Sequence, residues 1–441
     1  MYSNLVSDDR ENDASLISRL LTYLGIVITF QFLGFVTTFA YSSYLNRAGS
    51  FAQSFVFQSP DEPPVSVGFL RPQAFGNHFF GDYLQIYADV KTSGNGGYFG
   101  ASQLFLLLAT KLPYYLSLMF LLAIAILLLY VSARFLLNKM GLTEQLALLI
   151  GGFLFTQPVL FAIDRGQIHL LLFALLLLGL TLSIKDGGNK TWGAVLIATA
   201  VSMKLTPVFF LFLFVRKRAW KELKVSLISL IGLVLVPFAY LDSGFGAWKF
   251  VQGFIVGSKA ESNTYSSIEY FTGNLAYNNS FKLVSYHFSQ MNSGFGNVGG
   301  FVYDHYLLFA GLLSVFLCWL IIQKSISQFE SVLLMTIASS LLIPIAGGYT
   351  LMVFILPIVV VLADKDFAFS RLNIIYCCYL GIVLMPKQID LRLQTFEPYA
   401  ITVGGILNPS LSLLVVLFIS GKCFFSADSQ NSDSKTPVPV F

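Results

Sequence analysis

Two carboxylates lie in a polar loop just after the first apolar span of the chain. Asp82 and Asp89 are seven residues apart in FGDYLQIYADVKTSGNGGY, residues 80–98, among several tyrosines. If residues 80–91 are helical, this spacing places both acids on one face. A carboxylate next to an acceptor hydroxyl can act as the general base of glycosyl transfer, which typically contributes about 10²–10⁴-fold to the rate. The alternative is a solvated interfacial helix whose tyrosines belong to an aromatic belt.

A second polar cluster, DRGQIH, separates two apolar spans and contains Arg165, Gln167 and His169. Charges near the bilayer are costly, although less so at a helix end than at the centre. If Gly166 and Gln167 open the next helix, their backbone N–H groups can hold an anion. The alternative is a polar turn in which Asp164 pairs with Arg165.

Lys204 lies in MKLTP, between two apolar segments. A lysine in that position either snorkels to the surface or meets an anion, for which a lipid phosphate is a candidate. Further along the chain, Asn278, Asn279 and Ser280 form an N-x-S sequon and carry groups that can bind sugar hydroxyls. His287 and His305 are lone loop histidines, which are more often surface residues than catalytic ones.

The composition places these residues in a membrane protein. Only 11% of the 441 residues are charged and 56% are hydrophobic, whereas soluble proteins carry about 25% charged residues. No dense run of basic residues indicates a nucleic-acid partner. The four cysteines lie in or at the ends of apolar spans and show no metal-ligand spacing, so we predict neither a metal nor another cofactor.

The apolar pattern predicts an all-α polytopic membrane protein with about twelve membrane segments. The expected segments are Leu16–Tyr41, Tyr114–Leu137, Thr143–Ile163, Ile168–Ile184, Trp192–Met203, Pro207–Val215, Leu223–Tyr240, Tyr306–Ile322, Glu330–Ile343, Leu351–Leu362, Ile374–Leu384 and Ile401–Ser420. We expect a cytoplasmic tail over residues 1–15, a membrane domain over 16–425 and a disordered cytoplasmic tail over 426–441. The long loops of the membrane domain, about 43–103 and 242–304, are expected to lie outside. The reason is that the short connections near Lys139, Lys185 and residues 216–224 are basic.

Two of the apolar stretches are predicted to be pairs of half-helices. Residues 191–215 as one helix would place Lys190 and Arg216 on opposite sides of the membrane, yet both flanks are basic. Pro207 breaks the run, since proline disfavours helix at the preceding residue and lacks a donor. SLLIPIAGGYTLMVFILP, residues 340–357, repeats this pattern. Such breaks persist at membrane depth where protein or a water-filled cavity covers them.

Taken in order, several stretches resemble glycosyltransferase family 87, the mannosyl- and arabinosyltransferase-like membrane proteins of GT-C type. They are GDYLQIYADVKTSGNGGY (81–98), DRGQIHLLLFALLLLGL (164–180), KLTPVFFL (204–211), NNSF (278–281) and YTLMVFILP (349–357). The resemblance implies a GT-C bundle that transfers sugar from a polyprenyl-phosphate-linked donor to a glycolipid or cell-envelope glycan. It also implies an inverting, metal-independent reaction on the outer face of the inner or plasma membrane.

The resemblance assigns roles to particular residues. Asp82 best matches the general base, with Asp89 as the reserve. Gln167, His169, Asn279 and Tyr349 are the candidate substrate contacts. Mannosyltransferases of the family often carry Trp and His in the late broken pair, but IPIAGGYTL, residues 343–351, has neither. The donor phosphate then needs another cation, for which Arg165 and Lys204 are the candidates, and the sugar is left open.

Two other classes fit parts of the pattern. A transporter or flippase of a lipid-linked glycan also uses paired half-helices, but it should place ionisable groups near the membrane midplane and show related halves. A non-catalytic membrane scaffold would not need Lys204 or Arg165.

Overall fold

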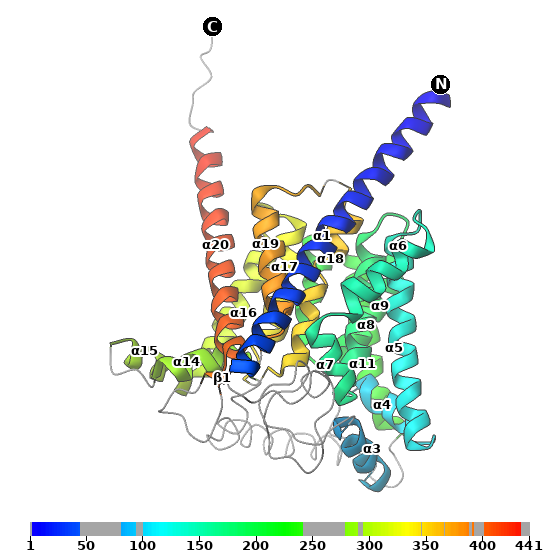
Figure 1. Ribbon diagram of the computed structural model, residues 1–441, viewed down its shortest axis with the longest axis vertical. Coiled ribbons are helices and arrows are strands. Elements are labelled where there is room, and N and C mark those ends of the chain that lie inside the picture. The colour runs from blue at the N-terminus through cyan, green and yellow to red at the C-terminus, as the bar shows by residue number, and fades with distance from the viewer. Residues whose placement is uncertain are drawn as a thin grey trace.

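The computed structural model describes residues 2–44, 81–93, 100–240, 278–289, 294–344, 346–365, 367–387, 390–391 and 401–433. These ranges are almost entirely helical, as the sequence predicts. Two short strands, β1 (Asp390–Leu391) and β2 (Ile401–Thr402), pair antiparallel. The helices form one bundle; α1 begins and α20 ends at the same end of it, while α3, α14 and α15 lie at the opposite end (Figure 1).

The helices follow one another with few long connections inside the described ranges. In chain order they are α1 (Tyr2–Tyr44), α3 (Gly81–Ser93), α4 (Gly100–Ala109), α5 (Tyr114–Leu136), α6 (Leu142–Ala147), the π-helix η1 (Leu148–Leu154), α7 (Gln157–Arg165), α8 (His169–Ile184), α9 (Lys190–Met203), the 3₁₀-helix η2 (Thr206–Leu211), α10 (Phe212–Arg216), α11 (Trp220–Tyr240), α14 (Phe281–Ser289), α15 (Gly294–Asp304), α16 (Tyr306–Ile322), α17 (Gln328–Leu341), the 3₁₀-helix η4 (Gly348–Ile355), α18 (Ile358–Ala363), α19 (Arg371–Leu384) and α20 (Val403–Asp433).

Burial divides these helices into inner and outer ones. α8 and α17 are buried around almost their whole circumference, which an apolar helix requires when neighbours surround it. The outer helices α5, α11, α16 and α20 each expose large apolar side chains, for example Leu127, Ile228, Val315 and Phe418. Such a surface suits lipid rather than water.

The expected count of about twelve membrane segments is not confirmed. Three helices of the described chain are long and apolar enough to cross a bilayer: Ala14–Thr38, Tyr114–Leu136 and Val403–Phe425. The count reaches five if two bent pairs, Leu142–Arg165 and Gly296–Ile322, are each one span. The physical reason is length, because spanning needs about 20 residues and helices such as α8 and α19 have 16 and 14.

Both predicted breaks are present. α9 ends at Met203, Lys204 is extended with φ −155°, and the chain resumes as η2 and α10. Lys217, just after α10, places its Nζ 3.4 Å from the carbonyl oxygen of Ser183 near the end of α8. The chain from α9 to α10 therefore returns to the end of the bundle from which it started, as a pair of half-helices does.

The second break separates α17 from η4 and α18. Its far end is tied to the same end of the bundle, because Lys365, after α18, forms an ion pair of 3.0 Å with Asp186 in the α8–α9 turn. Arg19 of α1 donates to the carbonyl oxygens of Val361 and Asp364 in the same region. The basic flanks thus gather at one end of the molecule.

The two expected tails continue as helix in the backbone. α1 already begins at Tyr2, and α20 runs past Ser426 to Asp433. Helix propagation from a packed segment costs far less than nucleation, so a packed helix can extend into a polar tail. The remainder of the expected C-terminal tail, residues 434–441, lies outside the described ranges.

Candidate functional site: a lysine–histidine cavity

A close helical hairpin brings His169 and Lys204 together. α8 begins at His169 and α9 ends just before Lys204. Because the two helices pair antiparallel, the start of α8 and the end of α9 lie side by side at the open end of the hairpin. The backbones approach at Gly179 and Gly193, where a Cβ on Gly193 would lie 2.8 Å from the carbonyl oxygen of Gly179. Asn189 caps the start of α9 by accepting a hydrogen bond from the Trp192 N–H.

Lys204, His169 and Gln167 form a hydrogen-bonded chain. The Nζ atom of Lys204 lies 2.8 Å from Nε2 of His169, and Nδ1 of His169 lies 3.1 Å from Oε1 of Gln167. An ammonium group only donates, so Nε2 accepts and the Nδ1–H donates to the glutamine oxygen. The imidazole is therefore neutral in this arrangement, and it orients the lysine without cancelling its charge.

The second broken pair adds an aromatic ring to this chain. Tyr349, in the first turn of η4, has its ring centroid 4.9 Å from that of His169. It also stacks on Phe161 of α7, with centroids 6.1 Å apart. Segments far apart in the sequence thus meet around one imidazole.

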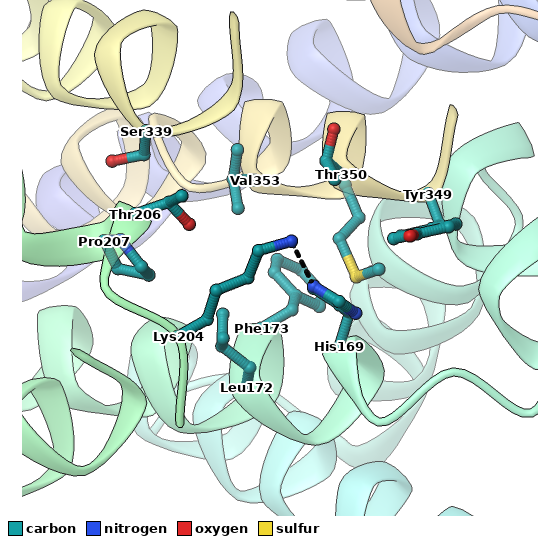
Figure 2. A pocket seen from close by; sticks show the side chains of 11 residues that line it. His169, Leu172, Phe173, Lys204, Thr206, Pro207, Ser339, Tyr349, Thr350 and Val353 are labelled. Atoms are coloured by element: carbon teal, nitrogen blue, oxygen red, sulfur yellow. Dashed lines mark hydrogen bonds between the residues drawn. The ribbon is translucent and has the colours of Figure 1, made fainter. Parts of the chain in front are cut away.

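Lys204, His169 and Tyr349 line a small cavity, shown in Figure 2. Its walls are His169, Leu172, Phe173, Lys204, Thr206, Pro207, Ser339, Tyr349, Thr350, Met352 and Val353. Lys204 is the charged side chain among them, and no carboxylate belongs to this set. In Figure 2, Thr206 and Ser339 lie on one side of the lysine, and His169 and Tyr349 lie on the other. The volume of about 20 Å³ accommodates about one water molecule, so a larger ligand requires the walls to move apart.

Three residues that directly precede α14 fix the break before Tyr349. Asn278 accepts from the Ala346 N–H at 2.9 Å and donates to the Pro344 carbonyl at 3.2 Å, and Ser280 donates to the same carbonyl at 2.8 Å. The backbone N–H of Asn279 donates to the Ala346 carbonyl at 2.8 Å. The break therefore has partners for backbone groups that would be costly to bury unpaired.

The structure places the other candidate residues outside the lining of this cavity. Asn279 is buried, and its side-chain oxygen accepts from Asn408 of α20 at 2.9 Å. Arg165 is the last residue of α7, followed by Gly166 in the left-handed conformation with φ 64°. The N–H groups of Gly166 and Gln167 donate to carbonyls of α7, and α8 begins at His169. The expected anion site on these two N–H groups is therefore wrong, because they cap the preceding helix.

The segment of the two candidate bases is helical, which is the condition under which their seven-residue spacing places them on one face. Asp82 and Asp89 both belong to α3, and the side chain of Asp89 is exposed; the side chain of Asp82 lies outside the described part of the structure. Tyr83 and Tyr87 are buried on the opposite face, where Tyr83 hydrogen-bonds Ser117 and Tyr87 donates to the Leu112 carbonyl at 2.8 Å. These two tyrosines dock α3 onto the start of α5. α3 also contacts α7, which ends at Arg165.

Several residues of the cavity are absent from the sequence-based set. Thr206, Ser339 and Thr350 line it, although short hydroxyl residues in apolar helices are common and most donate to their own helix. Ser339 is the exception in α17, because its buried hydroxyl has no hydrogen-bond partner among the described residues. Its neighbour Ser340 donates to the Thr336 carbonyl at 2.8 Å. Sequence alone gives no signal that separates these two serines.

No group of three or more His, Cys, Asp or Glu side chains in the described ranges is arranged to hold a metal ion. The chemistry available at the cavity is that of a cation, a neutral imidazole, a phenol and hydroxyl groups.

The apolar helices with lipid-facing surfaces define an integral membrane protein with a cationic internal cavity. The model of glycosyltransferase family 87 matches residues 100–360. The chain belongs to that family and is a membrane glycosyltransferase. No curated protein and no solved structure matches the chain. The matched region contains Arg165, Lys204 and Tyr349, whereas Asp82 and Asp89 precede it.

Proposed function

We propose that the enzyme moves a sugar from a polyprenyl-phosphate-linked donor to a hydroxyl of a glycolipid or cell-envelope glycan on the outer face of the inner or plasma membrane. The observation that carries this proposal is Lys204, a cation held by a neutral histidine in a cavity without a carboxylate. An ammonium in apolar surroundings attracts an anion strongly, and the donor of such an enzyme carries one in its phosphate.

The reaction proposed is a single displacement. The acceptor hydroxyl loses its proton to the Asp82 carboxylate, with Asp89 as the reserve base, while its oxygen bonds to the anomeric carbon. The bond from that carbon to the phosphate oxygen breaks, the configuration inverts, and polyprenyl phosphate leaves as an anion. Lys204 stabilises the charge that develops on the phosphate, which is where electrostatic catalysis is most effective. Arg165, at the end of α7, is the second candidate cation.

The remaining walls support this assignment. Leu172, Phe173, Met352 and Val353 give the cavity apolar surface that suits a prenyl chain, and Thr206 and Ser339 give it hydroxyl groups that can donate to phosphate oxygens. Gln167 and His169 orient the lysine, and Tyr349 offers its ring to the sugar. Asn279 is proposed to act on substrate indirectly, because its backbone N–H helps to hold the break that precedes Tyr349.

The test is sugar transfer by the purified protein in liposomes from a panel of radiolabelled polyprenyl-phosphate sugars. Lys204→Met removes the charge at nearly constant length, and loss of such a stabilising group typically lowers kcat by about 10²–10³. Lys190→Met is the matched control, since Lys190 is exposed at the opposite end of the same helix.

The same assay tests the general base. Asp82→Asn should abolish sugar transfer while donor binding persists, and Asp89→Asn should still transfer sugar.

The second candidate function is a flippase of a lipid-linked glycan, because paired half-helices also occur in transporters. If no donor of the panel is consumed and labelled lipid instead changes leaflet, the transferase assignment is wrong. If Lys204→Met transfers sugar as well as Lys190→Met does, the phosphate role of Lys204 is wrong.

A further inference from the structure

The helical hairpin formed by α14 and α15 projects sideways from the bundle, at the end opposite to the start of α1 (Figure 1). α15 is separated from α16 by His305 alone, and the two helices are bent by 87°. If α16 runs along the bilayer normal, with the tilt of about 20° usual for spanning helices, α15 lies close to the membrane plane.

α15 has three distinct sides. Gly299 faces α14 so closely that a Cβ there would lie 2.6 Å from Cβ of Phe288, and Tyr303 packs on Tyr286 with ring centroids 5.5 Å apart. A second side presents Val298 and Phe301, which are 62% and 64% exposed. The third side presents Asn297 and Asp304, which are seven residues apart and both exposed. At about 100° per residue, Asp304 lies about 120° around the helix from Val298 but only about 60° from Phe301. Phe301 is therefore at the centre of the exposed face, with Val298 on an apolar flank and Asn297 and Asp304 on a polar flank.

The exposed apolar residues of α15 are followed along the chain by exposed apolar residues of α16. Immediately after the bend, Leu307 and Leu308 are 71% and 62% exposed, and Val315 further along is 70% exposed. A helix whose exposed face is apolar on one flank and polar on the other, joined at nearly a right angle to an apolar helix, has the form of an interfacial amphipathic helix.

We infer that the α14–α15 hairpin is a membrane-surface element, whose Val298–Phe301 side inserts at the boundary of lipid headgroups and acyl chains in the outer leaflet. The occupant of this surface is bilayer lipid. α14 begins at Phe281, directly after Asn278, Asn279 and Ser280, which are hydrogen-bonded to the break before Tyr349. The hairpin therefore links the level of the membrane surface to a wall of the lysine–histidine cavity. The inference does not depend on the reaction proposed above.

The test is photocrosslinking of the full chain in phospholipid nanodiscs. p-Benzoyl-phenylalanine replaces Phe301 in one variant, Val298 in a second and Asp304 in a third, the last being the control on the polar side. We expect lipid adducts at positions 301 and 298, attached to the glycerol or the first acyl carbons when the adduct is fragmented in a mass spectrometer. Position 304 should give at least tenfold less lipid adduct than position 298, which lies farthest from it around the helix.

Three results would overturn the inference. Equal lipid adducts at all three positions would mean that the hairpin has no oriented side. Crosslinked dimers at positions 298 and 301 would mean that a second copy covers this surface. Absence of adducts from positions 298 and 301, in variants that elute like the wild type on size exclusion, would mean that the hairpin stands away from the bilayer.

Discussion

At the scale of single residues, the cavity depends on what holds Lys204. Its partner His169 is an acceptor through Nε2, and it is fixed in turn by Gln167 and by the ring of Tyr349. Such a chain orients the ammonium without supplying a counter-charge, which leaves the electrostatic attraction for an incoming anion intact.

Replacing His169 tests this arrangement. His169→Phe keeps a ring next to Tyr349 but removes the acceptor, so Lys204 loses its orientation. Hydrogen bonds to charged groups contribute about 1.5–3 kcal/mol, and we expect the affinity for a polyprenyl-phosphate sugar to fall about tenfold or more. His169→Gln, which retains an acceptor, should keep most of the affinity. Wild-type binding by the phenylalanine variant would contradict the orienting role.

Two adjacent serines provide a matched pair for the cavity wall. Ser339 lines the cavity with a hydroxyl that has no partner among the described residues, whereas Ser340 donates to Thr336 within α17. Ser339→Ala should weaken donor binding about fivefold to tenfold, as the loss of one hydrogen bond of about 1–1.5 kcal/mol predicts, with an unchanged unfolding midpoint. Ser340→Ala should bind donor like the wild type. Equal donor affinities in the two variants would exclude a role for Ser339 in donor binding.

At the scale of elements, the glycine contact between α8 and α9 sets the register of the hairpin. Gly193→Ala places a methyl group against the Gly179 carbonyl at 2.8 Å, and overpacking of this kind costs about 1–3 kcal/mol of unfolding free energy. Transfer activity should fall as well, because the separation of the helices moves His169 relative to Lys204.

Gly311→Ala is the control for this prediction, because Gly311 is exposed on α16 and an added Cβ there meets nothing within 4 Å. Its stability should be equal or slightly higher, since alanine favours helix over glycine. Chemical unfolding of the purified proteins in detergent measures both. An unchanged unfolding free energy for Gly193→Ala would show that the hairpin can separate without cost.

At the scale of the whole molecule, the arrangement of the breaks decides the topology. Lys217 reaches Ser183, and Lys365 reaches Asp186, so the basic ends of α8, α10 and α18 meet at one end of the bundle. α3 lies at the other end (Figure 1). The positive-inside rule then predicts that the basic end is cytoplasmic.

Labelling from each side of the membrane tests this topology. Cysteines introduced as Lys190→Cys and Lys221→Cys, both at exposed positions, should react with a membrane-impermeant maleimide only in inverted vesicles. Asp89→Cys, exposed on α3, should react in intact cells. The wild type, with its four cysteines, gives the background. Reaction of positions 190 and 221 from opposite sides would mean that α9 and α10 form one crossing.

The amino-acid sequence by itself determined the class of protein and the two breaks, and it was compatible with a helix over the candidate bases. These follow from local physics: apolar runs require lipid or burial, Pro207 cannot continue a helix, and the seven-residue spacing of Asp82 and Asp89 suits one face of α3. The resemblance to glycosyltransferase family 87, confirmed over residues 100–360, rests on the same local stretches.

Only the tertiary structure decided how the candidate residues assemble. It joins Lys204 to His169 and Tyr349 around one cavity, adds Ser339, and assigns the backbone N–H groups of Gly166 and Gln167 to a helix cap. It also shows several apolar runs as helices too short to span a bilayer alone. Contacts between segments 35 or more residues apart depend on how closely the two backbones approach each other, as they do at Gly179 and Gly193. The residue types along one segment do not specify the distance between backbones.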